Sequence, residues 1–336
     1  MDTQKYSRQV LFSPIGEAGQ RKLQTSKVVV VGCGALGSAQ ASTLVRAGVG
    51  AIRVVDRDYV EESNLQRQSL FDETDAAQRL PKAVAAERRL KRLNADVDVE
   101  GVVTDLGWRN ARELVAGFDL ILDGTDNFEA RYLLNDVAVK LGCPWVYGAV
   151  VGSYGVTLTV MPGRTACLAC LLPEPPRGLI DTCDTAGVIA PAAAWVAAAQ
   201  VTEAMKILIG REDELRGTLL AWDIWKNRIQ DVRVAPNPAC RVCGMGEFVY
   251  LDGRAQPQIN CCGRNSVQVI PHEPRRLDLD RLRRVLESQG AVRANAYLLQ
   301  FTREAYEITV FPDGRAMIKG TQDAAVARSL YARYLG

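Results

Sequence analysis

A strand, a glycine-rich turn, a helix and a second strand follow one another between Val28 and Asp56. The segment opens with four consecutive valines, which predict a buried strand, and residues 38–47 have the pattern of a helix. Three glycines lie in the turn between them: Gly32, Gly34 and Gly37. Such glycines let backbone N–H groups and a helix N-terminus approach a phosphate, and an acid after the next strand can hold a ribose hydroxyl. The segment therefore predicts a nucleotide site.

The alternation of strand and helix continues to about residue 148. Strand patterns lie at 28–31, 52–55, 97–103, 118–122, 145–148, 155–160 and 219–223. Helical patterns lie at 6–23, 38–47, 82–94, 109–115, 131–141 and 191–208. Strands that alternate with helices predict an α/β fold, with a doubly wound, Rossmann-like, mostly parallel sheet covered on both faces.

The composition changes beyond residue 252, which predicts two domains. Residues 1–252 are expected to form the nucleotide-binding domain and residues 253–336 a small α+β domain. In the second domain, strand patterns lie at 267–270, 296–301 and 306–311, and helical patterns at 278–287 and 323–334.

The charge balance gives no general argument for binding nucleic acid or a membrane surface. Lys and Arg number 41 and Asp and Glu number 39, for a net charge of +2. No uninterrupted apolar run approaches the roughly 18 residues of a membrane span, so we expect a cytoplasmic protein. The single histidine, His272, argues against a histidine base, an imidazole metal site and a Ser-His-Asp triad.

Two Cys-x-x-Cys pairs predict a structural zinc site. They are Cys167 with Cys170, and Cys240 with Cys243. Four thiolates suit tetrahedral zinc and leave no open position for catalysis, so the metal would tie two distant segments together. The alternative is that these are four unrelated buried cysteines.

The other cysteines are interpreted one by one. Cys183 lies in a loop flanked by proline and glycine, where it is either a reactive thiol or a bystander. Cys33 and Cys143 are interpreted as packing residues. The sequence assigns no role to the adjacent Cys261 and Cys262.

Charged side chains follow the predicted strands. Asp123 and Asp126 follow the strand at 118–122, at the ligand edge of the sheet, and this position favours a role in holding Mg²⁺ beside a triphosphate. The alternative is that Asp126 or Asn127 caps the next helix. Arg67 and Lys82 could clamp phosphates, with structural salt bridges as the alternative.

These features together resemble the ThiF/MoeB/HesA family, bacterial relatives of the ubiquitin-activating enzymes, over residues 1 to about 250. The resemblance rests on the glycine turn, the two Cys-x-x-Cys pairs and four further motifs: Tyr6-Ser-Arg8-Gln, Asp56-x-Asp58, Asn64-Leu-Gln-Arg67-Gln68 and Asp123-Gly-Thr-Asp126-Asn. It implies that ATP and Mg²⁺ are used to adenylate the C-terminal Gly-Gly carboxylate of a ubiquitin-like sulfur carrier. Carriers of the thiamin and molybdopterin pathways both fall within it.

The resemblance also implies a role for each site residue. Asp56 would hold the ribose, Arg67 and Lys82 the phosphates, and Asp126 would lie near Mg²⁺. Arg8 would reach the γ-phosphate of the neighbouring subunit in a homodimer. The residues that would complete the pocket are Asp58, Asn64 and Gln68. Cys183 aligns with the position that joins covalently to the carrier in ThiF-like members, and a sulfurtransferase is a further expected partner.

Residues 253–336 depart from the family pattern. They do not look like the rhodanese domain of some relatives, and they resemble the tail of longer ThiF-like proteins. They could recognise the carrier or a later sulfur-transfer partner.

Adenylation fits a site that has acids and cations but no histidine. A C-terminal carboxylate has a pKa of about 3.3–3.7, so it is already an ionised nucleophile at neutral pH and needs no general base. The reaction then requires in-line positioning and neutralisation of charge on the leaving pyrophosphate. The alternative function is an NAD-dependent oxidoreductase that uses the same glycine turn. That alternative gives no role to Arg67, Lys82 or the acids at 123 and 126.

Overall fold

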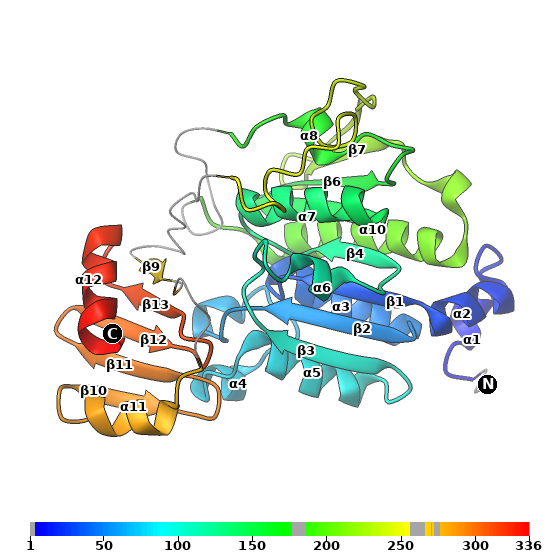
Figure 1. The fold of residues 1–336 in the computed structure, drawn as a ribbon. Coiled ribbons are helices and arrows are strands. Elements are labelled where there is room, and N and C mark those ends of the chain that lie inside the picture. The colour runs from blue at the N-terminus through cyan, green and yellow to red at the C-terminus, as the bar shows by residue number, and fades with distance from the viewer. Residues whose placement is uncertain (1–3, 177–185, 256–265, 270, 272–275, 336) are drawn as a thin grey trace. The chain divides into compact units, whose positions relative to one another are not determined.

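The computed structural model describes residues 4–176, 186–255, 266–269, 271 and 276–335. The chain divides into two compact units, residues 1–255 and residues 256–336 (Figure 1). Each unit has a sheet of its own.

The first unit is built on an eight-stranded sheet, in the order β3-β2-β1-β4-β5-β6-β7-β8. Its strands are β1 (Lys27–Val31), β2 (Ala51–Asp56), β3 (Asp98–Val103), β4 (Leu120–Asp123), β5 (Trp145–Val151), β6 (Tyr154–Val160), β7 (Thr218–Asp223) and β8 (Arg228–Arg233). Strands β1 to β5 are parallel, and β6, β7 and β8 extend the sheet in antiparallel pairs. The predicted mostly parallel α/β sheet is therefore confirmed.

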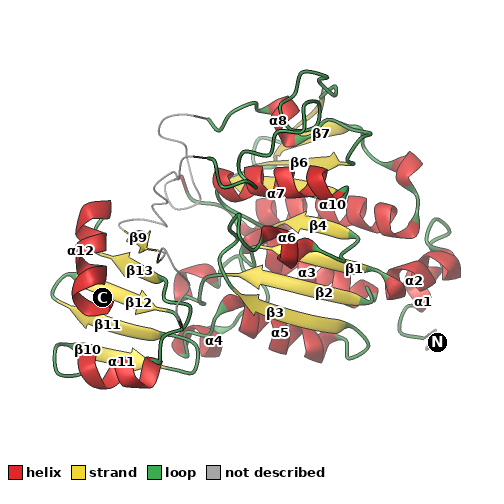
Figure 2. Cartoon of the chain, in the orientation of Figure 1, coloured by secondary structure: helices red, strands yellow, loops and turns green. Residues whose placement is uncertain are grey.

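Helices cover both faces of this sheet (Figure 2). They are α1 (Ser7–Val10), α2 (Gly16–Thr25), α3 (Ala35–Ala47), α4 (Glu73–Ala77), α5 (Lys82–Leu93), α6 (Ala111–Val115), α7 (Phe128–Leu141), α8 (Leu168–Leu171) and α10 (Ala190–Ile209), with short 3₁₀ turns η1 (Glu62–Asn64) and η2 (Glu212–Glu214). Helices α3, α5 and α10 pack on one face, and α6 and α7 connect the strands across the other.

Helix α10 belongs to the core of the first unit. Among the described residues it is the one helix long and apolar enough to cross a membrane by length and composition. It packs against α3, β5 and β6, and it carries two buried polar residues, Gln200 and Glu203, that bond to other protein groups. Its apolar character is that of a core helix.

The order of the parallel strands reverses at β1. This strand pairs with β2 on one side and with β4 on the other, and Val31 lies opposite Asp123 in the register. In open α/β sheets, ligands bind at the carboxyl ends of the strands where the order reverses. The residues that follow Val31 and Asp123 therefore form the expected ligand edge.

The second unit has a five-stranded antiparallel sheet, in the order β10-β11-β12-β13-β9. Its strands are β9 (Ser266–Val269), β10 (Ala291–Ala294), β11 (Leu299–Arg303), β12 (Tyr306–Val310) and β13 (Ala316–Lys319). Helices α11 (Leu279–Leu286) and α12 (Ala324–Leu335) pack on it around a core that includes Leu299, Phe301 and Ala327. A small α+β fold was predicted here and is found.

Some local predictions are wrong. The strand expected at 296–301 begins at Leu299, because Asn295 forms a turn in which its Oδ1 accepts from the N–H groups of Tyr297 and Leu298. Strand β8 was not predicted, since it is an edge strand whose residues are all exposed and show no apolar alternation. The helix expected from residue 38 begins at Ala35, so Gly37 lies inside it.

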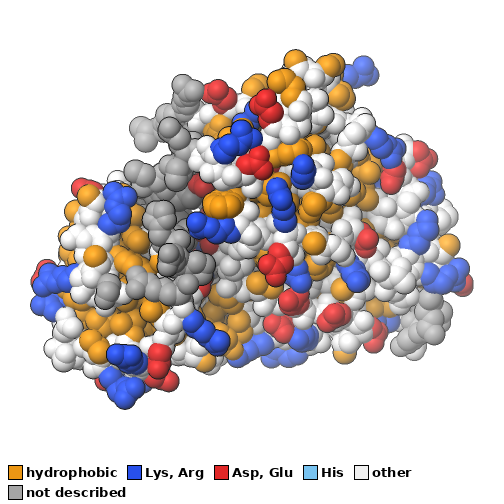
Figure 3. All heavy atoms as spheres, viewed as in Figure 1, with side chains coloured by type: hydrophobic (Ala, Val, Ile, Leu, Met, Phe, Trp, Pro, Cys, Tyr) orange, Lys and Arg blue, Asp and Glu red, His pale blue; other side chains and the backbone are white. Residues whose placement is uncertain are grey.

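Charges of both signs are interspersed on the visible surface (Figure 3). Lysine and arginine side chains alternate with aspartate and glutamate there, in keeping with 41 basic and 39 acidic residues in the chain. The electrostatics of the site must therefore come from local groups.

Candidate active site

The glycine turn after β1 is packed so closely that only glycine fits at two of its positions. A Cβ on Gly32, which has a φ of +86°, would lie 2.5 Å from the carbonyl oxygen of Gly124 in the turn after β4. A Cβ on Gly37 would lie 1.8 Å from the carbonyl oxygen of Gly32. The β1 turn, the β4 turn and the start of α3 are thus in backbone contact.

Gly34 has a different environment. A Cβ at this position would meet only the Gln68 amide nitrogen, at 3.9 Å, so the space beside Gly34 is open. Gly34 is the N-cap of α3 and supplies no side-chain cap to the first N–H groups of the helix. An open approach to uncapped N–H groups is what a phosphate requires at a helix N-terminus.

Asp56 ends β2 and is 8% exposed. Its Oδ2 accepts from the N–H of Cys33 at 2.6 Å and its Oδ1 from the N–H of Asp58 at 2.7 Å. Burial raises the pKa of Asp56, and Lys82 together with these two N–H donors opposes the rise. The carboxylate is therefore fixed beside the glycine turn, where the remaining lone pairs of its oxygens can accept from a ribose.

Lys82 is the buried cation of the site. It is 7% exposed, and its Nζ lies 3.4 Å from Oδ2 of Asp58. Burial by itself would lower the pKa of Lys82, but Asp58, Asp56 and Asp126 outweigh it and the pKa is raised. Lys82 therefore stays protonated at neutral pH and lies within electrostatic range of three predicted site residues.

The polar loop between β2 and α4 carries three more predicted residues. Asn64 is buried, and its Oδ1 accepts from the N–H of Glu61 at 3.4 Å, which shapes η1. Gln68 is 3% exposed, and its Oε1 has no hydrogen-bond partner among the described residues. Arg67 is partly buried and donates from Nη1 to the carbonyl of Ser63 at 2.8 Å. Gln68 thus offers an unused acceptor beside Gly34.

Asp123 and Asp126 have different environments although they are three residues apart. Asp123 is fully buried; its Oδ1 accepts from the N–H and the hydroxyl of Thr125, and its Oδ2 lies 3.9 Å from Nε of Arg131. Burial raises the pKa of Asp123, and Arg131 opposes this. Asp126 is exposed, and in the described part of the chain its carboxylate accepts one hydrogen bond, from Nδ2 of Asn127 at 3.3 Å.

The helix cap after β4 is Asn127. Its Oδ1 accepts from the N–H of Ala130 at 2.9 Å, so Asp126 is not needed for capping. The Asp126 carboxylate is free to bind a hard cation, and this environment fits Mg²⁺. The buried Asp123 carboxylate instead stabilises the turn after β4 through its hydrogen bonds with Thr125.

Several residues of the site were not predicted from the sequence. The Cys33 amide bonds Asp56, and Arg131 donates from Nη2 to the carbonyl of Thr125 at 2.9 Å. Gln40 and Gln200 both donate to the carbonyl of Asp123. Each glutamine is the only carboxamide in its helix, but both helices carry other polar residues, so no clear signal in the sequence indicated the glutamines.

Arg8 lies far from this cluster in its own chain. It is exposed on α1, and its neighbour Gln9 donates to the carbonyl of Ala47, the last residue of α3. The glycine turn is at the other end of α3, which has 13 residues, so the two ends are about 20 Å apart. Figure 1 shows α1 and α2 beside the start of β1. The structure thus does not bring Arg8 to the other predicted site residues.

The four paired cysteines come together. The Sγ atoms of Cys167 and Cys170 are 3.9 Å apart, those of Cys167 and Cys240 are 3.7 Å apart, and those of Cys170 and Cys243 are 3.3 Å apart. All four lie within 4.8 Å of one another. Tetrahedral zinc with Zn–S bonds of about 2.3 Å would space its sulfurs by about 3.8 Å. The cluster therefore fits zinc and joins α8 to the segment after β8.

Three cysteines considered in the sequence analysis lie outside the described residues: Cys183, Cys261 and Cys262.

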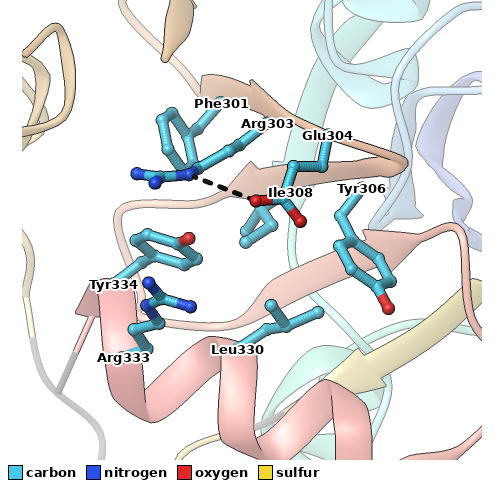
Figure 4. A pocket seen from close by; sticks show the side chains of 8 residues that line it. All are labelled: Phe301, Arg303, Glu304, Tyr306, Ile308, Leu330, Arg333 and Tyr334. Atoms are coloured by element: carbon cyan, nitrogen blue, oxygen red, sulfur yellow. Dashed lines mark ion pairs between the residues drawn. The ribbon is translucent and has the colours of Figure 1, made fainter. Parts of the chain in front are cut away.

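A shallow cavity of about 80 Å³ lies in the second unit, lined by Phe301, Arg303, Glu304, Tyr306, Ile308, Leu330, Arg333 and Tyr334 (Figure 4). Arg303 and Glu304 form an ion pair of 3.9 Å at its edge. The cavity contains no predicted site residue and is far smaller than the roughly 300–1,000 Å³ of a usual ligand site.

The sequence relatives of this chain are activating enzymes of carrier proteins, and a structural comparison supports the fold. The chain is 48% identical over 338 residues to the sulfur carrier protein ThiS adenylyltransferase of Bacillus subtilis, covering 99% of this chain and 100% of that protein. It is 42% identical over 243 residues to the SAMP-activating enzyme E1 of Haloferax volcanii, covering 72% and 89% of the two chains. A crystal structure of E. coli MccB with ATP has the same fold, with a TM-score of 0.64, 24% identity and coverage of 72% and 75%.

Residues 6–242 match the model of the ThiF family, a range that includes all the described site residues except Cys243. The match to the Bacillus subtilis protein also extends over the second unit. The resemblance inferred from the motifs is therefore confirmed. This chain belongs to the ThiF family.

Proposed function

We propose that this chain uses ATP to adenylate the C-terminal carboxylate of a ubiquitin-like sulfur carrier protein and releases pyrophosphate. The observation that carries the proposal is the environment of Lys82, a buried lysine whose pKa is raised by Asp58, Asp56 and Asp126. This cation lies at the ligand edge of the sheet, where it can neutralise the charge of a leaving pyrophosphate, and hydride transfer produces no such leaving group. Family membership and the names of the relatives support adenylation over the NAD-dependent alternative.

The carrier is of the ThiS type, which places the reaction in thiamin biosynthesis. The Bacillus subtilis relative is named for ThiS, and it is similar to this chain over both units. The second unit, which lies beyond the family match, then serves recognition of this carrier or of a later sulfurtransferase.

In the reaction, a carboxylate oxygen of the carrier attacks the α-phosphorus of ATP. The new bond joins that oxygen to phosphorus, and the bond from phosphorus to the bridging oxygen breaks as pyrophosphate leaves. Asp56 holds the ribose hydroxyls, and the open N-terminus of α3 at Gly34 receives phosphate oxygens. Lys82 and Arg67 neutralise the charge that accumulates on the leaving pyrophosphate. Asp126 would hold Mg²⁺ together with the triphosphate, and the metal would supply further positive charge there.

Within the pocket, the polar loop after β2 completes the binding of ATP. The open side of Gly34 faces the Gln68 amide, and the Oε1 of Gln68 is available to accept a hydrogen bond. Asn64 maintains η1, and Asp58 orients Lys82. These contacts support the roles that the family resemblance implies for the three residues.

Arg8 acts in the neighbouring subunit of a homodimer. Two observations support this: Arg8 lies at the opposite edge of the sheet from its own site, and Leu11 and Phe12 beside it are 72% and 60% exposed. Large apolar side chains at this level of exposure are suited to an interface.

Mixing two inactive variants tests the arrangement. The Arg8→Ala subunit keeps an intact Lys82, and the Lys82→Met subunit keeps an intact Arg8. After refolding together at equal amounts, we expect about a quarter of wild-type activity, because half of random dimers are mixed and each restores one of two sites. Activity that stays at the level of the separate variants would exclude action in trans.

Cys183 forms the covalent link to the carrier after adenylation: its thiolate attacks the acyl carbonyl of the carrier–AMP adduct, a thioester bond forms, and AMP leaves. In the wild-type protein, a carrier adduct should appear on a non-reducing gel after incubation with ATP. Cys183→Ser should still adenylate but form no adduct, and an adduct on this variant would assign the link to another thiol such as Cys261 or Cys262.

Mass spectrometry of the carrier tests the proposed reaction. Incubation with ATP and Mg²⁺ should convert the carrier to its AMP adduct, whereas a carrier that lacks the terminal Gly-Gly should remain unmodified. A wild-type enzyme that leaves every such carrier unmodified but binds NAD tightly would support the oxidoreductase instead.

A further inference from the structure

Two buried glutamines from different helices meet behind the turn that carries Asp126. Gln40 of α3 and Gln200 of α10 are both fully buried. Nε2 of Gln40 donates to the carbonyl of Asp123 at 2.9 Å and to Oε1 of Gln200 at 2.6 Å. Nε2 of Gln200 donates to the same carbonyl at 3.0 Å and to the carbonyl of Val146 in β5 at 2.9 Å. The last carbonyl of β4 thus receives two side-chain donors.

The neighbouring backbone is shaped to admit the Gln200 carboxamide. A Cβ on Gly148 of β5 would lie 2.4 Å from Cδ of Gln200, so only glycine leaves room there. A buried carboxamide without hydrogen bonds would cost roughly 1–3 kcal/mol, and this one uses both its N–H groups and its oxygen. The core is therefore shaped to hold the Gln200 carboxamide, and all its polar groups are hydrogen-bonded.

The carbonyl that the glutamines hold determines how the chain leaves β4. On the other side of the same peptide unit, the N–H of Gly124 donates to the carbonyl of Val31 at 2.8 Å. With both groups of the Asp123–Gly124 peptide bonded, the direction of the following turn is fixed. Among the described residues, the Asp126 side chain has one hydrogen bond, a long one, so its position depends on that backbone.

We propose that Gln40 and Gln200 are positioning residues for adenylation, which hold the β4 turn so that the Asp126 carboxylate faces Lys82 and the metal-bound triphosphate. The inference rests on the proposed function, because its effect is read in the adenylation reaction. Sites of this kind must be held to within about 0.5 Å, and a shift of about 1 Å can cost on the order of a hundredfold in rate.

The decisive variant is Gln200→Met, which keeps the volume of the side chain and removes its donors. We expect the Mg²⁺ concentration for half-maximal pyrophosphate exchange to rise about five- to tenfold, because a displaced Asp126 binds the metal less well. Excess Mg²⁺ should recover most of the exchange rate. Loss of stability alone would not change the Mg²⁺ requirement of the folded enzyme.

A matched control lies one turn further along α10. Glu203 is also buried, and its Oε2 accepts from the N–H of Arg216 at 2.9 Å and from the Thr159 hydroxyl at 3.1 Å, away from the β4 turn. Glu203→Gln disturbs a buried network on the same helix. It should lower the melting temperature and leave the Mg²⁺ requirement unchanged.

The outcomes separate the positioning role from the proposed function. Wild-type exchange together with an unchanged Mg²⁺ requirement in Gln200→Met would overturn the positioning role alone. If Gln200→Met does not fold, Gln40→Met is used instead, because it removes one donor to the carbonyl of Asp123. The Mg²⁺ concentration for half-maximal exchange is then measured for this variant. A wild-type enzyme without exchange activity would instead overturn the proposed function.

Discussion

Asp58 holds Lys82 through both its side chain and its backbone. Oδ2 of Asp58 lies 3.4 Å from Nζ of Lys82, and the carbonyl of Asp58 accepts from the N–H of Lys82 at 2.8 Å. The loop after β2 is thereby joined to the first turn of α5. The lysine is fixed in place before any nucleotide arrives, as electrostatic stabilisation of a leaving group requires.

Replacing Lys82 should therefore abolish catalysis. We expect Lys82→Met to reduce pyrophosphate exchange by ~100-fold or more, the usual effect of removing a preorganised charge-stabilising group. Lys91→Met is the matched control, since Lys91 is exposed on the same helix and pairs with Glu87 at the surface. Steady-state kinetics that give both variants similar activity would remove Lys82 from the reaction.

Variants of Asp126 and Asn127 should separate effects on activity from effects on stability. Asp126→Ala should abolish adenylation with an unchanged melting temperature, because the side chain is exposed and caps nothing. Asn127→Ala should lower stability by about 1 kcal/mol through loss of the α7 cap, while it keeps the Mg²⁺-binding carboxylate. Thermal unfolding and exchange assays on both variants give the comparison, and activity retained in Asp126→Ala would contradict its placement near the metal.

Zinc should be present at about one atom per chain, as four clustered thiolates require. Cys240→Ser should lose most of this zinc and unfold at a lower temperature, since binding at such sites contributes roughly 10–16 kcal/mol. Cys143→Ser, which removes a buried thiol outside the cluster, should keep the metal. Elemental analysis of the purified proteins measures the zinc content. A zinc content in Cys240→Ser equal to that of the wild type would argue against the four cysteines as the zinc ligands.

Asp136 should make stability fall as the pH rises from about 4 to about 6. This carboxyl is fully buried, and burial raises its pKa to about 6, against the N–H groups of Tyr250 and Leu251 that bond its Oδ2. The folded state therefore holds the proton more tightly than the unfolded state, and ionising Asp136 above pH 6 costs up to about 3 kcal/mol.

The neutral variant Asp136→Asn should lack this loss of stability, because its side-chain oxygen can still accept from both N–H groups. Urea unfolding at several pH values, with exposed Asp98→Asn as a control, measures the difference from wild type. A difference between Asp136→Asn and wild type that is the same at pH 4 and pH 7 would contradict the assignment.

The sequence predicted the parts of the site whose signals are local. The glycine turn follows β1 directly, Asp56 and Asp123 end β2 and β4, and parallel strands bring their carboxyl ends to one edge. The paired cysteines were predicted because each pair already has the spacing of a metal ligand set. Family resemblance then assigned roles that spacing alone left open.

The rest depends on contacts between distant residues. Gln40 and Gln200 are 160 residues apart, and no local pattern indicates that they share one carbonyl. The sequence likewise left the cap after β4 open, whereas the geometry assigns it to Asn127 and frees Asp126. Gly37 was expected in the turn, but its lack of a Cβ serves the close packing of α3 on Gly32.

ATP–pyrophosphate exchange tests the central claim most directly. Labelled pyrophosphate is supplied with ATP, Mg²⁺ and a ThiS-type carrier that ends in Gly-Gly, and label is measured in ATP. The account predicts exchange that requires the carrier's terminal Gly-Gly and is lost in Lys82→Met. Absence of exchange with every Gly-Gly carrier, or exchange that is unaffected by removing the carrier, would contradict it.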